Sequence, residues 1–111
     1  MKVINRGFLS VRHLQAFWDW ANPFNEEVQF NESDGVEPNC YLIEEDFMDI
    51  EPLIEQNFKK IFKNELAMAC EDQTQWPEKL TLELFLQFFE IEIGTTVFDL
   101  HKGDLKSESL S

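Results

Sequence analysis

Residues 50–71, IEPLIEQNFKKIFKNELAMACE, carry the clearest pattern in the chain and predict its longest helix. Apolar side chains recur there every three or four positions for five turns, which is the spacing of one helix face. Asp49 is the expected N-cap, and Pro52 lies in the first turn, where a proline is tolerated. The stripe is expected to face the core, and it consists of Ile50, Leu53, Ile54, Phe58, Ile61, Phe62, Leu66 and Ala69.

Shorter elements are expected before this helix. Residues 2–11 are rich in β-favouring side chains and predict one strand or a small hairpin. Residues 13–22 have helical periodicity. Residues 24–39 are acidic and turn-rich, so we expect a long loop there with at most a short strand at 28–30. Residues 40–43 form a compact apolar run that is typical of a central strand.

Two further elements are expected after the long helix. Thr81 is the predicted N-cap of a helix over 82–89 that is apolar on nearly all sides and therefore buried on nearly all sides. Trp76 is expected to pack on the core and to fix the polar connection before this helix. Residues 91–99 predict a strand that is interrupted at Gly94, where a bulge would fit.

This order of elements predicts an α+β fold. We expect a small sheet of about three to four strands with two or three helices packed on one face. The length of 111 residues suits one domain, which we place at residues 1–100. Residues 101–111 lose the apolar pattern and are expected to form a frayed polar tail.

The charge is concentrated in one part of the chain. There are 22 acidic and 9 basic residues, for a net charge of −13. Residues 13–58 hold twelve of the acids and no Lys or Arg. Because such a segment repels anions, direct contact with nucleic-acid phosphates and binding to an anionic membrane are both disfavoured. The acids either keep the protein soluble or attract a basic partner.

Motifs for catalysis or cofactor binding are missing from the sequence. Cys40, Cys70 and the two histidines lack the paired spacing of a zinc site. Four scattered glycines form neither a phosphate loop nor a dinucleotide-binding turn. We therefore predict no catalytic residue, no cofactor and a non-enzymatic role. No apolar run predicts a membrane span or a secretory signal, so a cytoplasmic location is expected.

Glu65 and Asp99 are polar residues beside strongly apolar stretches. Two interpretations remain open. Each carboxylate could accept hydrogen bonds from neighbouring backbone or Trp N–H groups, which would be a structural role. Alternatively, the two could line a shared polar pocket.

Short motifs follow one another between about residue 9 and residue 100. They are Val11-Arg12, Phe17-x-x-Trp20 running into Asn22, Tyr41-Leu42-Ile43-x-Glu45, Ile61-Phe62-x-x-Glu65-Leu66, Asp72-x-x-x-Trp76-Pro77, Thr81-x-x-x-Phe85 with Phe88-Phe89, and Val97-x-Asp99-Leu100. This ordered set resembles a group of small bacterial proteins of uncharacterised function. The chain departs from that pattern at His13, where proline is expected, and at Phe88, where tryptophan is expected. The resemblance implies a bacterial, cytoplasmic, single-domain protein, and it implies no activity, cofactor or site residue.

The leading functional hypothesis is a non-catalytic acidic protein-binding module that engages a basic partner, as immunity proteins or antitoxins do. We call its expected contact region the candidate interaction surface; it consists of Trp20, Glu26, Glu27, Glu32, Asp34, Glu37, Glu44, Glu45 and Asp46.

Two alternatives belong to other classes. One is a structural homo-oligomer, such as a homodimer, formed through the apolar helix over 82–89 together with Trp20 and Phe24. The other is a divalent-metal-binding protein or hydrolase that uses the carboxylates of Glu44, Glu45, Asp46 and Asp49, which are hard oxygen ligands.

Overall fold

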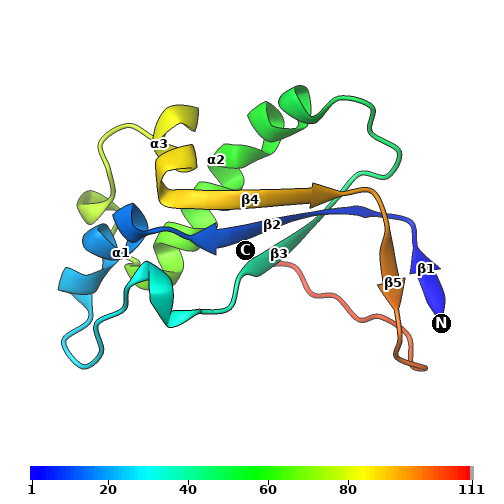
Figure 1. Ribbon diagram of the computed structural model, residues 1–111, viewed down its shortest axis with the longest axis horizontal. Helices are drawn as coiled ribbons and strands as arrows, with labels where there is room; N and C mark the ends of the chain where they lie inside the picture. The colour runs from blue at the N-terminus through cyan, green and yellow to red at the C-terminus, as the bar shows by residue number, and fades with distance from the viewer. Residues whose placement is uncertain (111) are drawn as a thin grey trace.

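The computed structural model describes residues 1–110 and has an α+β fold, as predicted (Figure 1). Its strands form two antiparallel sheets. In the larger sheet, β2 (Gly7–His13) lies between β3 (Asn39–Ile43) and β4 (Phe89–Gly94). In the smaller sheet, β1 (Lys2–Ile4) pairs with β5 (Val97–Asp99). Residue 111 of the predicted tail lies outside the described residues.

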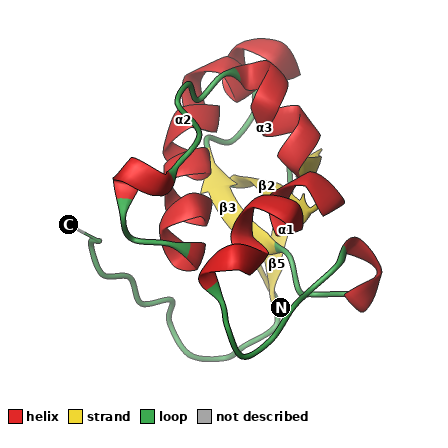
Figure 2. Cartoon of the chain, turned by 90° about the vertical axis from the view of Figure 1, so that its left-hand side faces the viewer, coloured by secondary structure: helices red, strands yellow, loops and turns green. Residues whose placement is uncertain are grey.

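Three α-helices accompany the larger sheet in the described chain: α1 (Gln15–Ala21), α2 (Ile50–Ala69) and α3 (Leu82–Phe88). The long helix α2 packs across one face of the sheet (Figure 1). Helices α1 and α3 lie together at the end of the sheet where β2 ends and β4 begins (Figure 2). The Leu14 backbone N–H donates to the Phe88 carbonyl at 2.8 Å and ties the two helices to this end.

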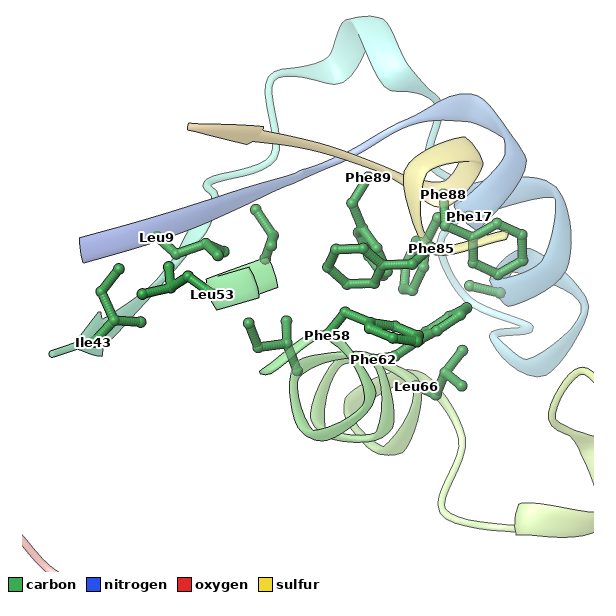
Figure 3. Close-up of a cluster of buried hydrophobic side chains, with 13 residues drawn as sticks. Leu9, Phe17, Ile43, Leu53, Phe58, Phe62, Leu66, Phe85, Phe88 and Phe89 are labelled. Carbon is green, nitrogen blue, oxygen red and sulfur yellow. The ribbon is translucent and has the colours of Figure 1, made fainter. Parts of the chain in front are cut away.

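The burial of side chains alternates along β2 and shows which face of the strand belongs to the core. Leu9, Val11 and His13 are buried, whereas Phe8, Ser10 and Arg12 on the opposite face are half-buried. Successive side chains of a strand point to opposite faces, so one face of β2 meets α2. The contact between α2 and α3 is largely aromatic. The rings of Phe58 and Phe62 on α2 lie against Phe85 of α3, with ring centroids 5.9 and 5.6 Å apart (Figure 3).

Predictions from local capping and packing signals are confirmed in part. Thr81 caps α3 by accepting a hydrogen bond from the Leu84 backbone N–H at 3.1 Å. Trp76 is half-buried and donates from Nε1 to the Cys70 carbonyl at 2.8 Å, which holds the connection before α3. Asp49 occupies the N-cap position of α2, but its side chain makes no capping hydrogen bond. Ile50 was expected in the core stripe and is exposed.

Other predictions about strands were wrong, because strands that pair with one another lie far apart in the sequence. β3 was expected to be central and is an edge strand, since β2 has the two neighbours. Residues 2–11 form no hairpin, because β1 and β2 belong to different sheets. The interrupted strand over 91–99 is two strands, and the chain changes sheets after Gly94 instead of forming a bulge within one strand.

Three short 3-10 helices complete the described elements: η1 (Asn22–Phe24), η2 (Glu32–Asp34) and η3 (Gln73–Gln75). Residues 28–30 are not a strand. The peptide of Phe30 pairs instead with the Asn22 side chain. Of the described helices, none is both long and apolar enough to cross a membrane.

Candidate functional site

A group of polar side chains lies between the inner face of the sheet and α2. Asn39 and Tyr41 are two residues apart on β3, so both point to the same face. The register pairs Asn39 with Val11 and Tyr41 with Leu9, whose side chains are buried on that face. His13, at the end of β2, lies on the same inner face. These three side chains converge on Glu65 of α2.

Glu65 is 1% exposed, and both of its carboxylate oxygens are occupied. Oε1 accepts hydrogen bonds from His13 Nε2 at 2.7 Å and from Asn39 Nδ2 at 3.0 Å. Oε2 accepts from Asn39 Nδ2 at 2.9 Å and from the Tyr41 hydroxyl. Asn64 Nδ2 in turn donates to the Tyr41 hydroxyl oxygen at 3.0 Å. A buried carboxylate is tolerated only when donors replace its lost hydration, and this arrangement supplies them.

The environment of Tyr41 favours its protonated form. Burial raises the pKa of the Tyr41 phenol well above its ordinary value of 10.0. The adjacent Glu65 carboxylate raises this pKa further, and the hydrogen bond from Asn64 opposes the change. Tyr41 therefore acts as a permanent hydrogen-bond donor to Glu65 at neutral pH.

A cavity of about 410 Å³ opens beside this polar group. His13 and Glu65 contribute to its wall from β2 and α2, and Met68 extends the wall along α2. Four aromatic side chains, Phe17, Trp18, Phe24 and Phe30, form part of the rest, together with small apolar side chains, three asparagines and Glu37. The volume falls within the range of sites that hold small molecules, roughly 300–1,000 Å³.

Among the described residues of this group, His13 is the one with a buried polar atom that has no hydrogen-bond partner. The side chain is 9% exposed and packs on the Phe17 ring at 4.5 Å and on the Trp18 ring at 5.2 Å. Its Nδ1 atom is buried and has no hydrogen-bond partner in the described part of the chain. Because a carboxylate only accepts, the contact with Glu65 places a proton on Nε2. Nδ1 then accepts a hydrogen bond when the ring is neutral and donates one when the ring is charged.

A loop that we call the cavity loop, residues 25–38, covers one side of the cavity. Two reciprocal contacts hold it against α1. The Asn22 side chain donates to the Phe30 carbonyl at 2.7 Å and accepts from the Phe30 N–H at 3.0 Å. Gln15 N–H donates to the Glu32 carboxylate at 2.8 Å, and Glu32 N–H donates to the Gln15 side-chain oxygen at 3.0 Å. These contacts, the second of them through Glu32 of η2, fix the position of the cavity wall.

The chemistry of the wall favours binding over covalent catalysis. None of the described residues that line the cavity is Ser, Thr or Cys, so His13 has no side-chain nucleophile to activate there. What the arrangement offers is one oriented imidazole nitrogen in an aromatic enclosure. A site of this kind can orient a ligand or exchange a proton with it.

The acids of the candidate interaction surface are all exposed, but they lie in two groups. Glu26, Glu27, Glu32, Asp34 and Glu37 belong to the cavity loop, before β3 begins. The remaining three, Glu44, Glu45 and Asp46, follow the last residue of β3, at the other end of that strand (Figure 1).

Two members of the candidate interaction surface have contacts of their own. Trp20 is half-buried and donates from Nε1 to the Gln75 carbonyl at 3.1 Å, so its ring is tied into the fold. Glu37 lines the cavity. The structure therefore links one acid of the predicted surface to the polar cavity.

The carboxylates proposed for a metal do not converge. Within residues 1–110, no group of three or more His, Cys, Asp or Glu side chains is arranged to hold a metal ion. Glu44, Glu45, Asp46 and Asp49 are all exposed.

Sequence reasoning identified Glu65 and missed its partners. Glu65 lines a polar cavity, as one interpretation held, but Asp99 does not share it. Asp99 lies on β5, 3.7 Å from Lys2 Nζ, and accepts a hydrogen bond from the His101 backbone N–H at 2.9 Å, which is the structural role. A usable signal for the partners was the spacing of Asn39 and Tyr41, two polar groups on one face of an otherwise apolar strand.

No family model, curated protein or solved structure matches the chain. The resemblance to small bacterial proteins therefore stays a prediction.

Proposed function

We propose that this protein is a small-molecule-binding domain whose ligand occupies the cavity and hydrogen-bonds to His13 Nδ1. One observation carries the proposal: His13 lines the cavity, and its buried Nδ1 has no partner among the described residues. Roughly 90% or more of buried polar groups in proteins are hydrogen-bonded, so an unpaired one at a cavity is a position for a ligand atom.

The surroundings of His13 support the same role. Glu65 holds the imidazole by its other nitrogen, at 2.7 Å, and Glu65 is itself fixed by Asn39 and Tyr41. The orientation of Nδ1 is thus set before a ligand arrives, which lowers the entropy lost on binding. Phe17 and Trp18 provide flat apolar surface beside it. The matching ligand has an apolar or aromatic body and one polar group.

A fragment screen followed by nuclear magnetic resonance tests this proposal. Binding should shift the signals of the His13 imidazole and the Trp18 indole N–H. The signals of His101 and Trp76, which do not line the cavity, should stay in place. A screen in which no fragment shifts the His13 or Trp18 signals would contradict the proposal.

Two pairs of variants locate the binding. His13→Phe should abolish binding, and His101→Phe is its matched control on the exposed tail. Because His13→Phe also removes a donor from Glu65, a second variant leaves the polar group intact. Val36→Trp fills the cavity from the cavity loop and should also abolish binding, whereas Val28→Trp, on the same loop but away from the cavity wall, should not.

The second candidate function is the acidic protein-binding module, in a protein that we propose to be bacterial and cytoplasmic. The supporting observation is that all eight predicted acids are exposed in a part of the chain, residues 13–58, that has no Lys or Arg. Clustered carboxylates steer a basic protein toward its site. A tagged pull-down eluted with rising salt tests it, because a partner held by surface charge leaves at moderate salt.

The homodimer alternative has a separate test. Leu86 on α3 is exposed, while Phe85 and Phe88 of the same helix are buried in the core of the single chain. Light scattering over a dilution series distinguishes a monomer from a dimer, and Leu86→Lys should dissociate a dimer that uses this helix.

A further inference from the structure

We infer that the cavity binds an organic cation, an ammonium or guanidinium group attached to an apolar or aromatic body. This inference rests on the proposed function and names its ligand class. It follows from the charges at the cavity, the hydrogen-bonding state of His13 and the aromatic wall.

The charged groups at the cavity are of one sign. Glu37 and Glu65 line it, and no Lys or Arg is among the described residues that do so. The cavity loop adds four more carboxylates close by along the chain, Glu26, Glu27, Glu32 and Asp34. A low-dielectric cavity lined by one sign of charge concentrates ligands of the opposite sign and repels ligands of its own. An anionic ligand is therefore disfavoured.

The contact between His13 and Glu65 leaves Nδ1 as the free nitrogen of the imidazole. On a neutral imidazole that donates from Nε2, Nδ1 is a hydrogen-bond acceptor. An ammonium or guanidinium N–H that donates to Nδ1 supplies this hydrogen bond and places a positive charge beside the Glu65 carboxylate. A carboxylate at the same atom would need a charged imidazole and would leave the enclosure with an excess negative charge.

The aromatic wall suits the same ligand. The Trp18 and Phe30 rings lie side by side with centroids 5.1 Å apart, and both line the cavity. The Phe17 ring also contacts Trp18, with centroids 5.0 Å apart. The faces of aromatic rings attract cations, with Trp the strongest, while their apolar surface receives the body of the ligand. An aromatic enclosure with a carboxylate at its wall is complementary to a cation and not to an anion.

Two sources share this chemistry: a free amine, or the Lys or Arg side chain of a basic protein segment. The first arm of the test compares three probes with one body, namely 2-phenylethylamine, 2-phenylethanol and phenylacetate. The second arm compares a short acetylated peptide that contains Lys with the same peptide containing norleucine. Binding is followed through the His13 and Trp18 resonances and by calorimetry.

We expect the amine to bind about tenfold or more tightly than the alcohol, a difference of about 1.4 kcal/mol, and phenylacetate to bind most weakly. Glu37→Gln should weaken binding of the amine about threefold to tenfold, because it removes one charge at a partly exposed site. The affinity for the alcohol should stay unchanged. Glu83→Gln is the matched control, because Glu83 is exposed, lies outside the cavity loop and does not line the cavity.

The outcomes separate this inference from the proposed function. If phenylacetate or the alcohol shifts the His13 signal at least as well as the amine, the cavity binds ligands but the cation assignment is wrong. If neither the three probes nor the Lys peptide binds, the cation assignment is also overturned, and the fragment screen decides the proposed function by itself. A free amine that binds where the Lys peptide does not identifies a metabolite-sized ligand; the reverse identifies a protein side chain.

Discussion

Glu65 is held by side chains from two strands. His13 comes from β2, Asn39 and Tyr41 come from β3, and Glu65 itself is on α2. If one of these donors is removed, part of the buried Glu65 carboxylate has no partner. The free energy of unfolding then falls by the desolvation penalty of a charged group, which is larger than the loss of one contact. The polar group therefore ties the edge strand to the long helix as well as orienting His13.

Tyr41→Phe isolates one donor of this group. The variant keeps the ring and removes only the hydroxyl that donates to Glu65. We expect a loss of about 1–3 kcal/mol in the free energy of unfolding, the range for a hydrogen bond to a charged group. Urea denaturation measures it. Cys40→Ala, on the exposed face of the same strand, is the control and should change stability by less than about 0.5 kcal/mol. Equal stability of Tyr41→Phe and wild type would show that Glu65 does not depend on the hydroxyl.

The same residue predicts a response to alkaline pH. The pKa of Tyr41 is raised in the folded chain, so the unfolded chain loses this proton first as the pH rises past about 10. The unfolded state then binds fewer protons than the native state, and stability falls with rising pH above that value. Tyr41 is the single tyrosine of the chain, so tyrosinate absorbance reports on it alone. We expect this absorbance to appear together with unfolding; ionisation near pH 10 in a protein that stays folded would contradict the prediction.

At the scale of elements, helices were more predictable than strand neighbours. The pattern placed α2 at 50–71 and the structure has Ile50–Ala69, because helix periodicity and capping depend on residues a few positions apart. The position of β3 at an edge depends on β2 pairing with β4, some eighty residues away in the chain, from His13 to Phe89 for example. No local pattern in residues 40–43 contains that information.

The candidate site was partly predictable for the same reason. Glu65 was notable in the sequence as an acid within an apolar helix face. The spacing of Asn39 and Tyr41 places both on one face of β3, but it does not show that they meet Glu65. That contact, and the contact of His13, form only after β2 and β3 pair in the register that places Asn39 opposite Val11. The unpaired Nδ1 of His13 and the cavity beside it are properties of that assembly and have no signal in the sequence.

The junction between the two sheets depends on a close approach at Gly7. A Cβ at this position would lie 2.8 Å from the Gly94 carbonyl oxygen and 3.0 Å from the Phe47 ring. Since the first of these contacts is with backbone, we expect Gly7→Ala to lower the free energy of unfolding by about 1–3 kcal/mol through strain. Thermal and urea unfolding measure it. Gly103→Ala is the control, because the Cβ there would meet only the exposed His101 side chain. If both variants are as stable as wild type, the close approach is not a constraint.

At the scale of the whole molecule, the negative charge is divided by the fold. The acids of the cavity loop precede β3 and those of the β3–α2 connection follow it. β3 has five residues, and a strand rises about 3.3 Å per residue, so the two groups lie on the order of 16 Å apart along the strand. This separation exceeds the Debye length of about 8 Å at physiological ionic strength. Each group of acids therefore attracts a basic partner largely independently of the other group.

That division gives a prediction for any basic partner recovered by pull-down. If the partner inserts a Lys or Arg side chain into the cavity, the cavity loop steers it, and Glu26→Lys with Glu27→Lys should lower its association rate about tenfold or more at low salt. Reversal of Glu44 and Glu45 to Lys, a matched change of the same size at the other end of β3, should leave the rate at physiological salt nearly unchanged. Stopped-flow measurements over a salt series give both rates. A larger effect at Glu44 and Glu45 would place the contact away from the cavity, and equal effects would mean that only the total charge of the protein matters.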